Sequence, residues 1–121
     1  MSPKQERIAD RIAEIDGKTQ SIKSLMQLAA NNNEHAFSYL SKIDVSFTEL
    51  RQIILLAAMD GVIKPMQLIG MINAINCATS HIMDVQSSAI VNEHPEFVLQ
   101  IDSNGTIQTT LATLRKYFIL H

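Results

Sequence analysis

The chain has 121 residues, of which 46% are hydrophobic and 18% are charged, a balance that excludes a disordered protein and supports one domain with a hydrophobic core. Its net charge of -2 provides no electrostatic attraction to nucleic acid or to an anionic membrane. A single cysteine, Cys77, excludes an internal disulfide, and the first residues lack the apolar segment of a signal peptide. These features predict a cytoplasmic protein without a membrane partner.

Residues 1–30 are predicted to form one long amphipathic helix. Pro3 suits its first turn, where a missing backbone N–H leaves no hydrogen bond unmade. Gly17 falls on the side opposite the apolar stripe, so a continuous helix is favoured over a break there. Leu25 and Leu28 widen the stripe, which favours packing in a larger bundle over an isolated coiled-coil dimer. Alternating spacings of four and three residues define this stripe, which consists of Ile8, Ile12, Ile15, Thr19, Ile22, Met26 and Ala29.

Residues 34–91 are predicted to be the helical core. They begin with a short amphipathic helix from Glu34 to Ile43, which follows an asparagine-rich loop. A second helix is expected to start at Ser46, because Ser46 and Glu49 fit a capping box. The two hydrogen bonds of such a box satisfy backbone amides that the start of a helix leaves free.

The remainder of this core is predicted to contain two apolar helices. The first is apolar on every side from Ile53 to Met59, so it is expected to be largely buried, and it ends at Gly61. A long helix then runs from Pro65 to about Val91. Its broad apolar face includes Leu68, Ile72, Ile75 and Ile82.

Residues 97–121 predict a β-hairpin followed by a terminal helix. Apolar and polar side chains alternate before the Asn-Gly turn signal that ends at Gly105, and strand-forming residues follow at 106–109. Thr110 is expected to cap the terminal helix. Three apolar residues lie on one face of that helix, namely Leu111, Leu114 and Phe118.

No group of residues in the sequence predicts catalysis, a cofactor or a metal ion. Cys77 and His81 lie one helical turn apart and can supply two zinc ligands, but a structural zinc site needs four. Ser80 points in a different direction from the adjacent His81, which argues against a hydrolytic triad with Asp84. We therefore expect a protein that is not an enzyme.

Two alternative functions remain open from the sequence. Residues 47–76 read as helix, turn and helix, which invites comparison with DNA-binding regulators. The second helix of this segment, however, offers no arginine and only Lys64 as a cation, which disfavours nucleic acid as a partner. The other alternative is a small-molecule sensor with an apolar pocket. Four methionines are candidates for its lining, namely Met59, Met66, Met71 and Met83.

The leading prediction is a mainly α helical bundle that forms a single domain over residues 1–121, with the small C-terminal hairpin and terminal helix attached. The two longest helices present more apolar face than one small domain readily covers. We therefore expect a non-enzymatic protein-interaction module that binds itself, as a homodimer or higher oligomer, and acts as an adaptor or regulator of another macromolecule, which we expect to be a protein. The predicted interface consists of Ile8, Ile12, Ile15, Ile22, Met26, Leu68, Ile72, Ile75 and Ile82.

Overall fold

The computed structural model describes residues 2–31, 35–91 and 105–119. Within these ranges the chain forms four α-helices and no β-strand, which confirms the prediction of a mainly α helical bundle. The helices are α1 (Pro3–Asn31), α2 (Ala36–Met59), α3 (Pro65–Val91) and α4 (Thr106–Ile119). α4 has 14 residues against 29 in α1, so the fourth helix is about half as long as the first.

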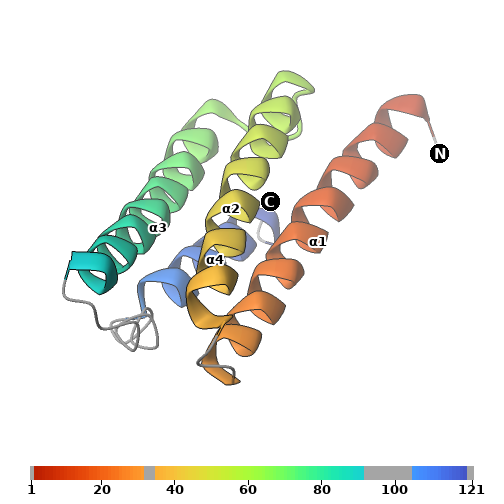
Figure 1. Ribbon diagram of the computed structural model, residues 1–121. Helices are drawn as coiled ribbons and strands as arrows, with labels where there is room; N and C mark the ends of the chain where they lie inside the picture. The colour runs from red at the N-terminus through yellow and green to blue at the C-terminus, as the bar shows by residue number, and fades with distance from the viewer. Residues whose placement is uncertain (1, 32–34, 92–104, 120–121) are drawn as a thin grey trace.

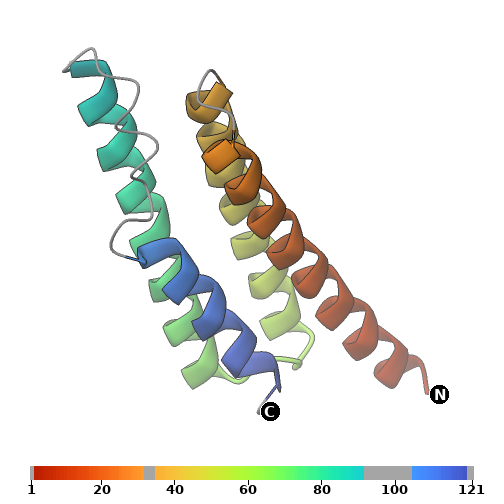
Figure 2. The ribbon, with the colours of Figure 1, turned by 90° about the horizontal axis from the view of Figure 1, so that it is seen from below.

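Consecutive helices run antiparallel, so the bundle goes up, down, up and down (Figures 1 and 2). α1 packs along α2, α2 packs along α3, and α4 packs on α3. α1 and α4 make only a few contacts with each other. In Figure 2, α1 lies in front of α2 and α4 lies in front of α3, and the N-terminal half of α1 diverges from α4. α1 and α4 therefore contact each other over only a short part of their lengths.

α1 begins with a reciprocal capping box. The Ser2 hydroxyl oxygen accepts from the Gln5 backbone N–H at 3.2 Å, and the Gln5 side-chain oxygen accepts from the Ser2 backbone N–H at 2.9 Å. The helix continues without interruption through Gly17, where an added Cβ would meet no atom within 4 Å. The prediction of one long helix with Pro3 in its first turn is confirmed.

The predicted break before Ser46 is wrong, because α2 is one helix over Ala36–Met59. Four fully buried side chains keep one helical spacing across the predicted gap, namely Leu40, Ile43, Phe47 and Leu50. Inside a continuous helix each amide donates to the carbonyl four residues earlier, so Ser46 and Glu49 have no free amide to cap. Burial of one apolar stripe over the whole segment therefore overrides the local capping pattern.

The connection from α2 to α3 agrees with the prediction. Gly61 has a φ of 79° and follows the C-cap residue Asp60. The Val62 N–H donates to the Ala57 carbonyl at 2.9 Å and the Gly61 N–H donates to the Ala58 carbonyl at 3.1 Å, which together form a Schellman motif. α3 then spans Pro65–Val91, as predicted.

The predicted hairpin and its helix boundary are wrong in the part that the structure describes. Residues 106–109, predicted to be a strand, form the first turn of α4, and Thr110 lies inside this helix instead of capping it. Gly105, with a φ of 72°, immediately precedes the helix. The helix is selected by the burial of Ile107, Leu111 and Leu114, which repeat at spacings of four and three residues. The proposed first strand, before residue 105, lies outside the described residues.

One hydrophobic core joins all four helices. α2 supplies more of its large side chains than any other helix, and Phe47 is the largest of the fully buried residues described. Thr110 of α4 ties the end helix to α3, since its hydroxyl donates to the Ala74 carbonyl at 3.1 Å and to the Thr106 carbonyl at 3.0 Å. The remaining core contributions come from Ile15 and Ile22 of α1, Ile63 between α2 and α3, Met71, Ile75, Ala78 and Ile82 of α3, and Ile107, Leu111 and Leu114 of α4.

Candidate interaction surfaces

The predicted interface residues of α1 divide between the core and the surface. Ile15 and Ile22 are fully buried within the chain and belong to its own core. Ile12 is 40% exposed, while Ile8 and Met26 are half-buried. The structure therefore leaves Ile12, with parts of Ile8 and Met26, available on α1 for contact with another molecule.

The predicted interface residues of α3 divide in the same way. Ile75 and Ile82 are fully buried in the core of the chain. Leu68 and Ile72 are half-buried and pack against the edge of this core. A periodic apolar stripe alone does not distinguish these two environments, because both satisfy the same helical spacing.

The residues considered for chemistry do not assemble into a reactive site. Cys77 is exposed on α3, one turn from the half-buried His81. Within the described ranges, no three His, Cys, Asp or Glu side chains come together in a way that can hold a metal ion. The four methionines also lie apart, since Met71 is fully buried and the other three are largely exposed.

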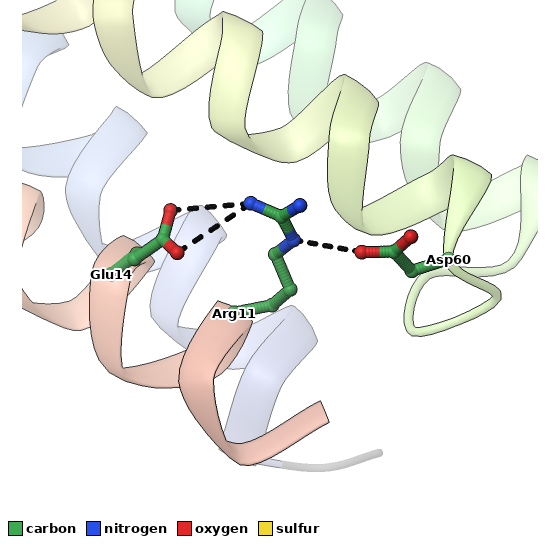
Figure 3. A network of polar contacts seen from close by, with 3 residues as sticks. All are labelled: Arg11, Glu14 and Asp60. Carbon is green, nitrogen blue, oxygen red and sulfur yellow. Dashed lines mark hydrogen bonds and ion pairs between the residues drawn. The ribbon is translucent and has the colours of Figure 1, made fainter. Parts of the chain in front are cut away.

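The α1–α2 side of the bundle is tied by charged groups. The Arg11 guanidinium donates from Nε to the Asp60 carboxylate at 2.8 Å and pairs with Glu14 at 3.4 Å (Figure 3). The hydrogen bond with Asp60 raises the pKa of Arg11, with a smaller contribution from Glu14, so this side chain stays charged. Further along the same pair of helices, Lys18 pairs with Glu49. Ion pairs therefore join α1 to the C-terminal end of α2 and to its middle.

On the α2–α3 side, by contrast, one hydrogen bond between uncharged side chains joins the two helices. The Gln86 side-chain amide of α3 donates to the Ser41 hydroxyl of α2 at 2.9 Å. From Ser41 a row of residues follows α2 at alternating spacings of four and three. It consists of Ser41, Val45, Thr48, Gln52, Leu55 and Met59. A matching row on α3 includes Gln86. It runs from Gln86 toward the N-terminus of α3, and in the other direction it ends at Ile90. This second row consists of Ile69, Ile72, Asn76, Thr79, Met83, Gln86 and Ile90.

The Ser41–Gln86 hydrogen bond joins the two rows, and because α2 and α3 are antiparallel both rows run from this bond toward the turn between the helices; we call them together the uncharged strip. No residue of the strip is Asp, Glu, Lys or Arg. Val45 is 56% exposed and Met83 is 66% exposed, and they stand one turn from the Ser41–Gln86 pair. Of the charged residues of α2, Glu49 pairs with Lys18 of α1 and Arg51 is half-buried, whereas Lys42 is exposed beside Ser41 and Asp44 is half-buried beside Val45.

Sequence reasoning did not identify the uncharged strip, although a signal for it is present. Between Gln52 and Met83, only Asp60 and Lys64 carry a full charge, and both lie at the turn between α2 and α3. The uncharged run from Ile53 to Met59 predicts a largely buried helix, and this prediction is wrong for Leu55, Leu56 and Met59, which are exposed. The structure buries only one face of each helix, so the other face meets solvent without charged side chains, which is unusual for a surface.

A groove lies on the opposite side of the bundle, between α1 and α4. It contains a hollow of about 480 Å³ over the N-terminal half of α1 and a second of about 400 Å³ farther along the helix. Lys23 of α1 and Arg115 of α4 line both hollows, so the two hollows adjoin at these residues. We call this feature the α1–α4 groove. Its apolar lining includes Ala9, Ile12, Ala13 and Ile15 in the first hollow, and Met26, Leu111 and Ala112 in the second.

The fold and these surfaces define a class of protein, a small antiparallel helical bundle with two contrasting exposed faces. No family model, characterised protein or solved structure was found that matches the chain. Within the described ranges, none of the helices combines the length and the hydropathy needed to cross a bilayer. α3 carries one charged residue, Asp84, and therefore offers no cation for contact with phosphate.

Proposed function

We propose that the chain is a cytoplasmic, non-enzymatic protein-interaction module that self-associates through the uncharged strip and acts as an adaptor or regulator. The single observation behind this proposal is the strip itself. Exposed large hydrophobic side chains gather on α2 and α3, and they include Val45, Leu55, Met59, Ile69, Met83 and Ile90. Burial of such a surface against another protein is favourable, because it removes apolar area from water.

The lack of charge favours a second copy of the chain as the occupant of the strip. In a two-fold dimer, the same patch meets itself, so charged residues on it would face like charges unless they were offset. A strip of apolar and amide side chains has no such repulsion. The α1–α2 side, by contrast, carries the charged residues Arg11, Lys18 and Glu49. If two copies met through this side, like charges on the two copies would repel each other.

The size of the strip sets the expected strength of the dimer. The row on α2 covers a helix length of about 27 Å and the row on α3 about 32 Å, and two helices side by side are about 20 Å wide. A dimer would therefore bury on the order of 1,000 Å² in total, which lies at the lower end of specific interfaces. We expect a dimer that dissociates on dilution, so the solution mass has to be measured over a wide range of concentrations.

The test compares the wild-type chain with the double variant Val45→Lys, Met83→Lys by light scattering on a sizing column. Wild type is expected to approach twice the mass of one chain at high concentration. The double variant is expected to remain at the mass of one chain, because a dimer would bury unpaired ammonium groups. Circular dichroism should show the same helix content for both proteins, since both replaced side chains are largely exposed.

The matched control is Leu28→Lys, which changes another exposed apolar side chain, 47% exposed, on α1. This variant should dimerise as the wild type does. A wild-type mass of one chain at every concentration would contradict self-association. A double variant that dimerises like the wild type would show that the dimer uses a different surface.

A further inference from the structure

We infer that the α1–α4 groove is a docking site for an acidic amphipathic helix of a partner protein. This inference rests on the proposed function as an interaction module and names the chemistry of the second partner. Three properties of the groove carry it: its length, its apolar floor and the two cations at its centre.

The length of the groove matches a helix. Its lining residues on α1 run from Ala9 to Gln27, which corresponds to about 27 Å along the helix axis. An occupant that fills both hollows along this line would be a helix of about 18 residues, or about five turns. The site exists because α4 is half as long as α1, so the corner that a full fourth helix would complete stays open.

The floor of the groove suits the apolar face of such a helix. Ala9 and Ala13 lie one turn apart on α1, and their small side chains permit the close approach of another helix. Ile12 lies between them and is partly exposed in the absence of a partner. Leu111 and Met26 continue the apolar lining into the second hollow. Helix-in-groove recognition uses anchors at positions i, i+3, i+4 and i+7, which a floor of this shape can receive.

The charges of the groove specify an acidic helix. Lys23 and Arg115 line both hollows, and the structure shows no ion pair for either side chain among the residues that it describes. Among the described residues that line these two hollows, Asp16 is the one carboxylate, so cations exceed anions there by two to one. Glu or Asp side chains beside the apolar stripe of the partner would pair with Lys23 and Arg115.

The probe is a synthetic, fluorescently labelled peptide of about 18 residues, the length that the groove accommodates. It has Leu at helical i, i+3, i+4 and i+7 spacings, Glu beside this stripe, and Ala elsewhere. A second peptide replaces every Glu by Lys and keeps the stripe. Fluorescence anisotropy then measures binding of each peptide to the full chain. The acidic peptide is expected to bind saturably and about tenfold or more tightly than the basic peptide, because only the acidic peptide pairs with the groove cations.

The double variant Lys23→Glu, Arg115→Glu tests where the peptide binds. It is expected to lose about tenfold or more in affinity for the acidic peptide and to gain affinity for the basic peptide. The control is Lys4→Glu, Lys116→Glu, which makes the same change in net charge at exposed positions that do not line either hollow. This control should bind the acidic peptide as the wild type does.

Several results would overturn the inference. The first is that the acidic peptide shows no saturable binding. The second is that Lys23→Glu, Arg115→Glu binds this peptide as tightly as the wild type does. The third is that the control Lys4→Glu, Lys116→Glu loses as much affinity as Lys23→Glu, Arg115→Glu. Tighter binding of a peptide that copies residues 3–20 would assign the groove to a second copy of the chain. Binding to vesicles of phosphatidylcholine with phosphatidylglycerol, without binding of the peptide, would assign it to a membrane surface.

The same titration with Val45→Lys, Met83→Lys separates this inference from the proposed self-association. The uncharged strip lies on the other side of the bundle, so this variant should bind the acidic peptide with wild-type affinity. If the wild-type chain proved monomeric and still bound the acidic peptide, the groove would remain a docking site. Only the proposed dimer would then be contradicted.

Discussion

Two isoleucines of α1 show how differently one residue type is used within a single turn of helix. Ile12 is 40% exposed, whereas Ile15 is 1% exposed and belongs to the core. An aspartate at position 15 would place an unpaired carboxylate among apolar side chains, while at position 12 it would stay partly solvated. Ile12→Asp is therefore the substitution that probes the α1 surface without disrupting the core.

Gly17 is a residue at which the structure predicts a gain in stability. It lies exposed in the middle of α1, and an added Cβ would meet no atom within 4 Å. Gly17→Ala is expected to raise the free energy of unfolding by about 1 kcal/mol, because alanine favours the helix and restricts the unfolded backbone. Urea denaturation followed by circular dichroism measures this change.

Gly61→Ala is the control for Gly17→Ala, since the φ of 79° at Gly61 strains any residue with a Cβ. We expect it to lower the free energy of unfolding by about 1 to 2 kcal/mol. If Gly17→Ala failed to stabilise the chain while Gly61→Ala destabilised it, the N-terminal half of α1 would not be a stable helix in solution.

Among the helices, α4 shows most clearly how packing overrides local preference. The residues at 106–109 favour a strand by composition, yet they form the first turn of α4. Strand preference of this kind depends strongly on context. As a helix, the segment buries Ile107, Leu111 and Leu114 together against α3, which a strand with alternating side chains would not do.

Thr110 is expected to contribute to the docking of α4 on α3. Its hydroxyl donates to the Ala74 carbonyl at 3.1 Å, and the residue is buried. Thr110→Val keeps the side-chain shape and removes this donor, so it should lower the free energy of unfolding by about 1 kcal/mol. The neighbouring Thr109→Val changes an exposed hydroxyl and should have an effect below about 0.5 kcal/mol. Equal effects in urea denaturation would show that the bond to Ala74 does not stabilise the packing.

At the scale of the whole molecule, the two candidate surfaces lie on opposite sides of the bundle. The strip consists of residues of α2 and α3, and the α1–α4 groove is lined by residues of α1 and α4. In Figure 2, α1 and α4 lie in front of α2 and α3. A dimer formed through the strip would hold two grooves that point away from each other. If both proposals are correct, the assembly would bind two partner helices at once.

This arrangement predicts avidity on a surface coated with the acidic peptide. On a dense coating, the wild-type chain should dissociate about tenfold or more slowly than Val45→Lys, Met83→Lys, because a dimer can bind through both grooves. On a sparse coating, the two proteins should dissociate at the same rate. Surface plasmon resonance at two coating densities measures both cases. A difference that persists on the sparse coating would indicate a change within the groove itself.

The sequence by itself determined the elements that depend on nearby residues. α1, the turn at Gly61 and the extent of α3 follow from helical spacing, from glycine at the C-terminal cap and from proline in the first turn. The same reasoning failed at Ser46, where a capping pattern occurs inside a helix, and at residues 106–109, where a strand preference meets a buried helical stripe. Local patterns identify possible helix ends, but they contain no information on what packs against the segment.

Only the tertiary structure decided which apolar faces remain available to other molecules. Ile12 and Ile15, or Ile72 and Ile75, share an apolar stripe in the sequence, and the neighbouring helices determine which of each pair is buried. The uncharged strip requires α2 and α3 side by side, and the groove requires a fourth helix too short to cover the first. The physical reason is that hydrophobic burial is a property of contacts between segments far apart in the chain, whereas capping and turn preferences act within a few residues.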